Sequence, residues 1–276
     1  MKTGSPYTLA IILRSTNIEH FRLMLHSVLR QQYLPAEVLY IGLASSGSAV
    51  VQLAAQNPLP LDVEQSLLWC TATERSDAHI NWCVLETIAR RVRTDAIVVT
   101  ENDIIVDSDF TQALLAACQE STVVTAFPVI LSPRLSAQLD EAAIAAGEPF
   151  GSWWQVVLDG IVGQTRHPLR IIPRRWQFGM RWYGGRELSS SALAFDRATL
   201  DRLVAVRSCG ECRSSHELLR CAGLTCSNAT GLVLHARLTQ MRSHVFALAP
   251  VTAPQWSGPS LSVLDVRPVL RRHRLN

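Results

Sequence analysis

The first 130 residues alternate between short apolar runs and longer segments whose apolar residues have helical spacing. Residues 8–13 are a continuous apolar run of strand length, and the mostly apolar residues 37–43 and 95–100 are predicted to be further strands. Between the first two runs, apolar side chains of residues 18–32 recur every three or four positions, which predicts a helix with one buried face. Strands that alternate with helices in this way form a parallel sheet with helices on both faces. We therefore expect an α/β fold with a Rossmann-type, mostly parallel sheet.

Composition and charge exclude several classes of protein. The 276 residues are 48% hydrophobic and 18% charged, which is ordinary for a globular chain and excludes wholesale disorder. Lys and Arg number 26 against 23 Asp and Glu, so the net charge of +3 is too small to indicate a nucleic-acid partner. The apolar stretches are shorter than the ~20 residues of a membrane span, and no secretory signal opens the sequence. We expect a cytoplasmic protein.

Seven cysteines are present, and in the cytoplasm we expect them to be reduced. Paired thiolates at short spacing can bind zinc. Four cysteines lie close together late in the sequence, at Cys209, Cys212, Cys221 and Cys226. The second pair is separated by four residues rather than two, which is less typical of a zinc site. Both interpretations, a zinc site and free thiols, stay open.

A buried strand leads directly into two carboxylates. Glu101 and Asp103 follow the apolar residues 97–99 and are two residues apart, so in an extended chain both side chains point to the same side. Ligands of open parallel sheets bind beyond the carboxyl ends of the strands, where this pair would lie. Two convergent carboxylates suit Mg²⁺ or Mn²⁺ together with substrate phosphates. The alternative is a solvated acidic turn, because Asp107 and Asp109 follow at once.

This acidic segment resembles the metal-binding Asp-x-Asp motif of family-2 glycosyltransferases of the GT-A fold, with Glu101 in place of the first aspartate. Residues 9–17 resemble the opening strand of that family and the turn that an Asn closes. Residues 27–41 resemble its Ser-x-x-x-Gln, Pro and Glu-hydrophobic segment. Residues 189–197 resemble the segment before its acceptor-side helix, and residues 232–235 its late strand with a His. These pieces occur in the order of the family.

The resemblance covers about residues 7–237 and implies a metal-dependent, inverting glycosyltransferase of polysaccharide biosynthesis. The enzyme would move a sugar from a nucleotide-sugar donor to a hydroxyl of a glycan, a lipid-linked acceptor or a small molecule. Mn²⁺ or Mg²⁺ would be the cofactor, held by Glu101, Asp103 and His235. A core histidine is the alternative for His235. The donor-binding residues implied are Arg14, Thr16, Asn17, Asn81 and Asn102. Formation of the turn after the first strand is the alternative for Thr16 and Asn17.

An inverting transfer needs a group that takes the proton of the attacking hydroxyl. Glu217 is the predicted base and His216 its substitute, because both lie near the place of the family's late catalytic pair. The alternative for Glu217 is an exposed helix residue paired with arginine. Aromatic faces stack on sugar rings, so we expect an acceptor pocket formed by Trp153, Trp154 and Trp182. Core packing is the alternative for Trp182 and for the nearby Trp176.

Two departures from the family favour other functions. Gly42 and Leu43 stand where the family has an Asp that receives the nucleotide base, and Glu101 replaces an Asp. Both favour a degenerate GT-A-fold protein that binds a nucleotide sugar or a protein partner without transfer. A nucleotidyltransferase is a third possibility, but the glycine-rich, basic loop typical of that class does not follow the first strand.

We expect three parts along the chain. Residues 1–130 form the nucleotide-sugar-binding α/β half, and residues 131–245 the acceptor-binding and catalytic half of the same GT-A domain. Residues 246–276 form a Pro-rich, basic C-terminal extension. Residues 271–274 are all basic and suit contact with anionic lipid, so we expect a protein that is free in the cytoplasm or peripheral at the inner face of the membrane.

Overall fold

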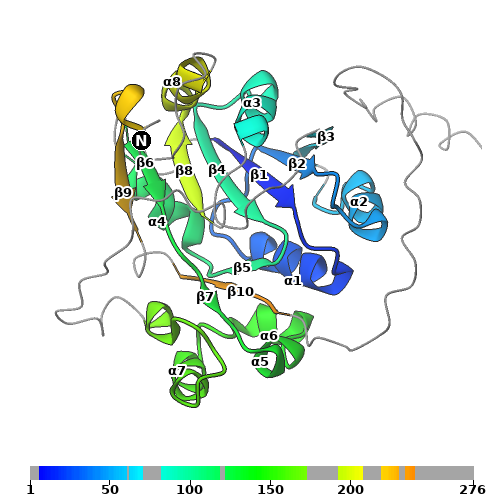
Figure 1. Cartoon of the computed structure of the whole chain (residues 1–276). Coiled ribbons are helices and arrows are strands. Elements are labelled where there is room, and N and C mark those ends of the chain that lie inside the picture. Colours follow the sequence, from blue (N-terminus) through cyan, green and yellow to red (C-terminus); the bar gives the residue numbers. More distant parts are fainter. Residues whose placement is uncertain are drawn as a thin grey trace, which may run out of the picture.

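The computed structural model describes residues 6–60, 62–70, 82–118, 122–172, 192–207, 219–229 and 234–239, which form one large and one small sheet (Figure 1). The strands of the large sheet, in spatial order, are β3 (Glu64–Trp69), β2 (Glu37–Gly42), β1 (Tyr7–Leu13), β4 (Ala96–Glu101), β8 (Leu193–Asp196), β6 (Thr122–Thr125) and β9 (Thr225–Asn228). Those of the small sheet are β5 (Ile104–Val106), β10 (His235–Arg237) and β7 (Val129–Ile130).

The first four strands of the chain form the parallel half of the large sheet. β1 pairs in parallel with both β2 and β4, and β2 pairs in parallel with β3. Every residue of β1, β2 and β4 is buried. This burial explains their continuous apolar runs, because a parallel strand has both faces covered by helices.

Helices pack on both faces of this sheet. They are α1 (Ile18–Leu29), α2 (Ser48–Ala55), α3 (Trp82–Arg91), α4 (Phe110–Ala117) and α8 (Arg197–Arg207). Leu9 and Ile11 of β1 share a core with α1, α2 and α4. Ala10 and Ile12, which alternate with them, share a core with α3 and α8 on the other face. The predicted α/β fold, with a mostly parallel sheet between two helical layers, is confirmed.

The far half of the large sheet contains an antiparallel strand. β8 pairs antiparallel with β4 on one side and with β6 on the other, and β9 continues the sheet parallel to β6. The apolar run before Asp196 predicts a strand here. The direction of β8 depends on the connection that precedes it. An apolar run predicts a strand but not its direction.

The small sheet carries a group of short helices below the large sheet in Figure 1. They are α5 (Pro133–Ala137), α6 (Glu141–Ala146), α7 (Trp153–Ile161) and the 3₁₀ helix η1 (Pro168–Ile171). Ile105 of β5, Val129 of β7 and Ala236 of β10 form a core with residues of these helices. The small sheet thus joins the segment after β4 to the last described strand.

Several elements differ from the sequence prediction for physical reasons. β3 lies at the edge of the sheet and begins with Glu-Gln-Ser, so no continuous apolar run marks it. The segment 147–187 shows little periodicity, yet α7 forms within it. The late strand is His235–Arg237 rather than residues 231–235, of which 231–233 lie outside the described residues. The division of the chain at residues 130 and 245 stays a prediction.

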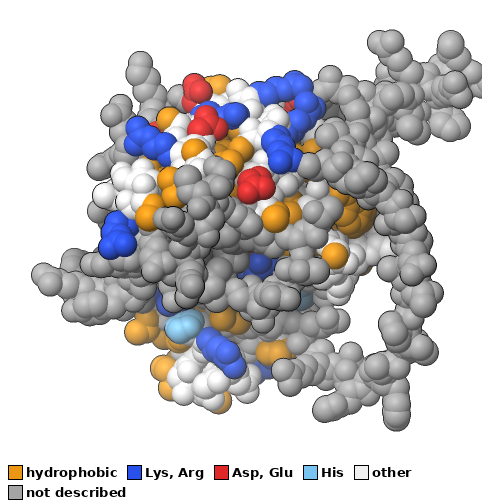
Figure 2. All heavy atoms as spheres, turned by 45° about the horizontal axis from the view of Figure 1, so that its top comes forward, with side chains coloured by type: hydrophobic (Ala, Val, Ile, Leu, Met, Phe, Trp, Pro, Cys, Tyr) orange, Lys and Arg blue, Asp and Glu red, His pale blue; other side chains and the backbone are white. Residues whose placement is uncertain are grey.

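The described surface mixes charges of both signs. In the view of Figure 2, acidic and basic side chains lie interspersed over the upper part of the molecule. Within the described ranges, none of the helices combines the length and the apolar character that crossing a bilayer requires.

Candidate functional site

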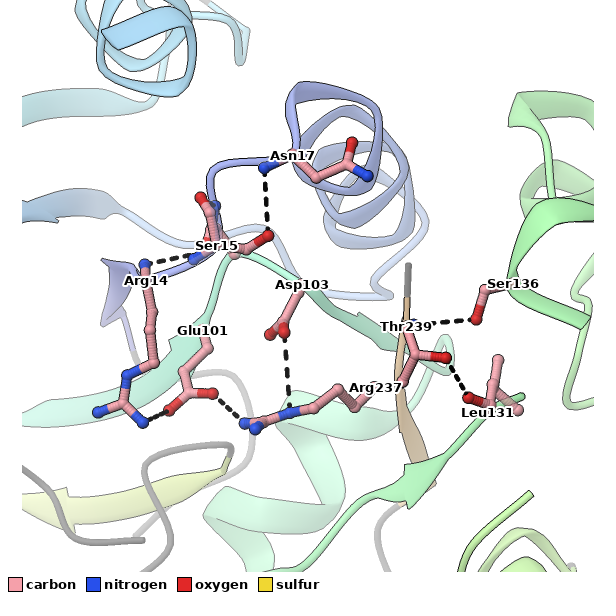
Figure 3. Close-up of polar contacts among 10 residues, drawn as sticks. Arg14, Ser15, Asn17, Glu101, Asp103, Leu131, Ser136, Arg237 and Thr239 are labelled. Atoms are coloured by element: carbon pink, nitrogen blue, oxygen red, sulfur yellow. Dashed lines mark hydrogen bonds and ion pairs between the residues drawn. The ribbon is translucent and has the colours of Figure 1, made fainter. Parts of the chain in front are cut away.

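The candidate site forms where β1 and β4 end side by side. Ile12 of β1 pairs with Glu101 of β4, so both strands end at the same edge of the sheet. β1 continues into a loop of residues 14–17 before α1, and β4 continues into a turn of Asn102 and Asp103 before β5. Polar residues from both connections therefore meet at this edge, together with Arg237 of β10 (Figure 3).

Asn102 holds the two connections together. Its Oδ1 accepts hydrogen bonds from the backbone N–H groups of Arg14 (2.9 Å) and Ser15 (2.8 Å), and its Nδ2 donates to the carbonyl oxygen of Ser15 (2.8 Å). The Asn102 side chain is completely buried, and these bonds satisfy its amide. The resemblance implies a donor contact for Asn102, whereas the structure shows it fixing the loop that carries Arg14.

The predicted donor residues Thr16 and Asn17 belong to the same loop. The Asn17 Oδ1 caps α1 by accepting from the backbone N–H groups of Glu19 (2.9 Å) and His20 (3.2 Å). Thr16 faces Gly47 so closely that a Cβ on Gly47 would lie 3.0 Å from the Thr16 Cβ. Both residues therefore shape the loop after β1.

Gly42, which stands where the resembling family has a base-binding Asp, lies under an aromatic ring. A Cβ at Gly42 would lie 3.0 Å from the ring of Trp69, at the end of β3. A side chain at this position would require the Trp69 ring to shift by a few tenths of an ångström. The glycine at this position, where the resembling family has an aspartate, therefore agrees with the close packing of Trp69 from the neighbouring strand.

Glu101 is buried beneath two arginines. One oxygen of its carboxylate lies 3.0 Å from Nη1 of Arg14, and the other contacts Nη2 of Arg237. The Glu101 side chain is 0% exposed, whereas those of Arg14 and Arg237 are 15% and 24% exposed. The two guanidinium groups supply the opposite charge that a buried carboxylate requires.

Asp103 lies on the other side of Arg237. Its Oδ2 is 3.8 Å from Nε of Arg237, and its Oδ1 is buried without a hydrogen-bond partner among the described residues. Burial raises the pKa of Asp103 above its ordinary value, because desolvation outweighs the attraction of Arg237. Nearby Glu101 raises the pKa of Asp103 further. The Arg237 guanidinium thus lies between the two carboxylates of the acidic motif (Figure 3).

His235 occupies a different place on β10. It is buried, pairs with Val106 of β5, and its ring centre lies 5.6 Å from that of Phe110. Within the described ranges, no three His, Cys, Asp or Glu side chains lie close enough together to hold a metal ion. The structure therefore does not gather Glu101, Asp103 and His235 as a ligand set.

The described residues do not fit a divalent cation. Mg²⁺ and Mn²⁺ are held through carboxylate oxygens, but guanidinium groups contact both oxygens of Glu101. A metal ion between Glu101 and Asp103 would also meet the positive charge of Arg237. Sequence reasoning missed Arg237. The signal available was a basic residue two positions after His235, just beyond the predicted late strand of residues 232–235.

Several predicted residues fall elsewhere. On α7, Trp153 packs against the core of the small sheet, and Trp154 is 52% exposed. Cys221 is exposed, and Cys226 is half-buried on β9. The predicted residues outside the described ranges are Asn81, Trp182, Cys209, Cys212, His216 and Glu217.

A cavity of about 460 Å³ opens beside this site, between the start of α1 and helices α5 and α6. Asn17 and His20 line one side of it, and Asp140 and Thr239 another. Thr239 lies two residues after Arg237 and is fixed there by bonds to Ser136 and Leu131 (Figure 3). Residues 237–239 therefore contribute one side chain to the charged cluster and another to the lining of the cavity.

No family model and no curated protein matches the sequence. Among solved structures, the chain aligns over 93% of its length with 46% of GalNAc-T7 with UDP, GalNAc and Mn²⁺, at 9% identity and a TM-score of 0.51. It aligns over 87% of its length with 58% of the mannosyltransferase PcManGT from Pyrobaculum calidifontis in complex with GDP-Man and Mn²⁺, at 18% identity and a TM-score of 0.47.

A third alignment covers 86% of the chain and 73% of glucosyl-3-phosphoglycerate synthase from Mycobacterium tuberculosis in complex with Mn²⁺, UDP-Glc and phosphoglyceric acid, at 10% identity and a TM-score of 0.40. The chain spans about half the length of the first two structures. At these identities the likeness concerns the fold. The mostly parallel seven-stranded sheet between helices and the likeness to GalNAc-T7 give the chain a GT-A-like fold.

Proposed function

We propose that this protein is a glycosyltransferase that moves a sugar from a nucleoside-diphosphate donor to a hydroxyl acceptor. The observation that carries the proposal is the buried cluster of Arg14, Glu101, Asp103 and Arg237 at the carboxyl ends of β1 and β4. In an open α/β sheet this edge is where ligands bind, and the cluster offers partly exposed guanidinium groups there. Guanidinium groups suit the oxygens of a diphosphate, because they donate several N–H bonds in one plane.

The proposed reaction is a single displacement. The acceptor hydroxyl oxygen attacks the anomeric carbon and forms the new C–O bond. The bond from that carbon to the diphosphate oxygen breaks, and the diphosphate leaves with the electron pair. We propose Glu217, with His216 as its substitute, as the base that takes the hydroxyl proton. Attack opposite the leaving group inverts the anomeric centre.

The donor would lie over the loop that Asn102 holds. Arg14 begins this loop, and its side chain is 15% exposed, so it can reach a phosphate without leaving Glu101. Thr16 and Asn17 fix the conformation of the same loop. Asn81 is proposed as a further donor residue on the strength of the family resemblance alone. The Mn²⁺ present in the compared structures supports a metal cofactor in those proteins, but the described residues here do not accommodate one.

We propose that the acceptor is presented at a membrane surface. Four apolar side chains on or just after α7 are between 52% and 75% exposed: Trp154, Leu158, Ile161 and Val162. Their spacing places them on one helical face, and the exposed Arg166 and the half-buried Arg170 follow. An apolar face beside basic residues is typical of helices that lie in the interface of an anionic bilayer. The basic residues 271–274 would add to this attraction.

Thermal unfolding tests the proposed donor site. UDP, GDP, TDP and ADP are each added to the wild-type protein and to the Arg14→Ala variant, and the melting temperature is measured. One nucleotide is expected to stabilise the wild type, by ~2.7 kcal/mol at a hundredfold excess over its Kd, and Arg14→Ala should reduce this effect. Arg22→Ala is the matched control, because Arg22 is an exposed arginine on α1 that pairs with Glu19.

Either of two results would contradict the proposed site. One is an unchanged melting temperature with every nucleotide. The other is equal stabilisation of the wild type and Arg14→Ala. Stabilisation without any turnover of the corresponding nucleotide sugar would instead favour the alternative function, a GT-A-fold protein that binds the donor and does not transfer it.

A further inference from the structure

We infer that the guanidinium of Arg237, together with that of Arg14, binds the donor diphosphate in the position where a divalent cation would otherwise act. The inference rests on the proposed function and specifies the chemistry of its donor site. Its basis is the arrangement around the acidic motif, where Arg237 contacts Glu101 and lies 3.8 Å from Asp103.

The exposure of the three charged groups sets the order in which a ligand meets them. Glu101 is completely buried, and the side chains of Arg14 and Arg237 are 15% and 24% exposed above it. A diphosphate that approaches from solvent therefore reaches the guanidinium groups first. The carboxylate lies beneath the arginines, where it orients them.

The charges of the cluster resemble those of a metal site. The two guanidinium groups together carry a formal charge of +2, the same as one divalent cation, and they face two carboxylates. Positive charge that is already in place stabilises a departing diphosphate without reorganisation during the reaction. The arginines therefore supply the same electrostatic effect through hydrogen-bond donors instead of through coordination.

The backbone fixes Arg237 from both sides. Arg237 pairs with Ile104 on β5 and with Ile130 on β7, in the middle of the small sheet. The next residue, Leu238, donates its N–H to the carbonyl oxygen of Asp103 at 2.9 Å. Arg14 is fixed in turn by the bond from its N–H to Asn102. Such preorganisation is what a charged binding site needs to act on a ligand without distortion.

The test compares nucleotide binding with and without metal. Isothermal titration of the wild-type protein with the stabilising nucleoside diphosphate is carried out in EDTA and again in Mn²⁺ or Mg²⁺. We expect the two dissociation constants to differ by less than about twofold. Arg237→Ala should weaken binding in EDTA by at least about tenfold, because it removes charge-assisted bonds, and Arg237→Lys should weaken binding less.

A second expectation concerns Arg237→Ala, in which Glu101 and Asp103 lose the guanidinium of Arg237. Without the guanidinium, Glu101 and Asp103 can approach a cation, so Mn²⁺ should restore part of the nucleotide binding of Arg237→Ala and have no such effect on the wild type. Circular dichroism checks that the variant is folded, and Arg22→Ala again serves as the control. The wild-type comparison requires no variant and tests the inference even if Arg237→Ala does not fold.

The failures of the two proposals are distinguishable. Wild-type binding that needs Mn²⁺ or Mg²⁺ would overturn the inference and leave the proposed function intact. Equal binding by wild type and folded Arg237→Ala in EDTA would also overturn it. If no nucleoside diphosphate binds in either buffer, the proposed function itself is contradicted.

Discussion

Three consecutive residues after the apolar part of β4 perform three different tasks. Glu101 lies under two arginines, Asn102 holds the loop after β1, and the Asp103 backbone accepts a bond from Leu238. The sequence marks this segment as important because polar residues follow a buried strand. It does not show which partner each side chain meets, since Arg14 and Arg237 are far from the segment along the chain.

Asn102→Ala should strongly destabilise the protein. The change removes three hydrogen bonds and takes from Ser15 the partners of both its N–H and its carbonyl, whereas the Arg14 N–H keeps a bond to the carbonyl oxygen of Ile12 at 3.0 Å. Unpartnered buried groups cost about 1–3 kcal/mol each, so the free energy of unfolding should fall by about 2–4 kcal/mol, since water can reach part of the loop. Urea denaturation measures the change. Asn17→Ala, which removes only a helix cap, should cost about 1 kcal/mol.

A fall of less than about 0.5 kcal/mol for Asn102→Ala would contradict the role of Asn102 as the link between β1 and β4. Asn102→Asp sharpens the comparison. It keeps the acceptor for Arg14 and Ser15 but removes the donor to the Ser15 carbonyl.

Glu101→Gln tests the ion pairs directly. The amide keeps the shape of the side chain but removes the buried negative charge that both guanidinium groups contact, and leaves Asp103, 3.8 Å from Arg237, as the remaining carboxylate of the cluster. Loss of one partner from a buried pair should lower the free energy of unfolding by roughly 3 kcal/mol. The exposed pair of Glu19 and Arg22 provides the control, because Glu19→Gln should have little effect. Equal effects of the two substitutions on denaturation would show that the Glu101 pairs do not form.

At the scale of elements, burial decided what the sequence could predict. β1, β2 and β4 are buried throughout and mostly apolar because both faces are covered, and the sequence predicts their segments. α1 was predicted to reach residue 32 but ends at Leu29. Gln31, just beyond, is buried for another reason: its amide bonds the backbone of Asp107 and Thr111. α6 was missed although Asp140 caps its start and Gly147, with φ of 97°, ends it.

The exposed face of α7 should bind anionic vesicles. Leu158→Ser combined with Ile161→Ser removes two side chains that are 53% and 75% exposed. Since burial of one such side chain contributes about 1.5–3 kcal/mol, the double variant should bind phosphatidylserine vesicles at least about tenfold more weakly in a flotation assay. Leu34→Ser, at an apolar residue that is 40% exposed after α1, should not change binding. Equal flotation of both variants and wild type would contradict a membrane role for α7.

At the scale of the whole molecule, the site forms because strands late in the chain pair with strands from its first half. β8 enters beside β4, and β10 enters beside β5, so the two halves share both sheets. Alternating strands and helices were enough to predict β1, β2 and β4 of the parallel half, though not β3 at its edge, and the side of the sheet at which the site lies. The position of Arg237 between Glu101 and Asp103 was not predictable, because it depends on the pairing of β10 with β5.

Release of nucleoside diphosphate from nucleotide sugars is the direct test of a glycosyltransferase site at the ends of β1 and β4. The wild type, Arg14→Ala and Arg22→Ala are incubated with a panel of UDP-, GDP- and TDP-sugars, and the free diphosphate is measured. The wild type and Arg22→Ala should release it from at least one donor at similar rates, by transfer or slow hydrolysis. Arg14→Ala should be at least about tenfold slower, because it loses charged bonds to the diphosphate. No release from any donor, or equal rates for all three proteins, would contradict a glycosyltransferase site at the ends of β1 and β4.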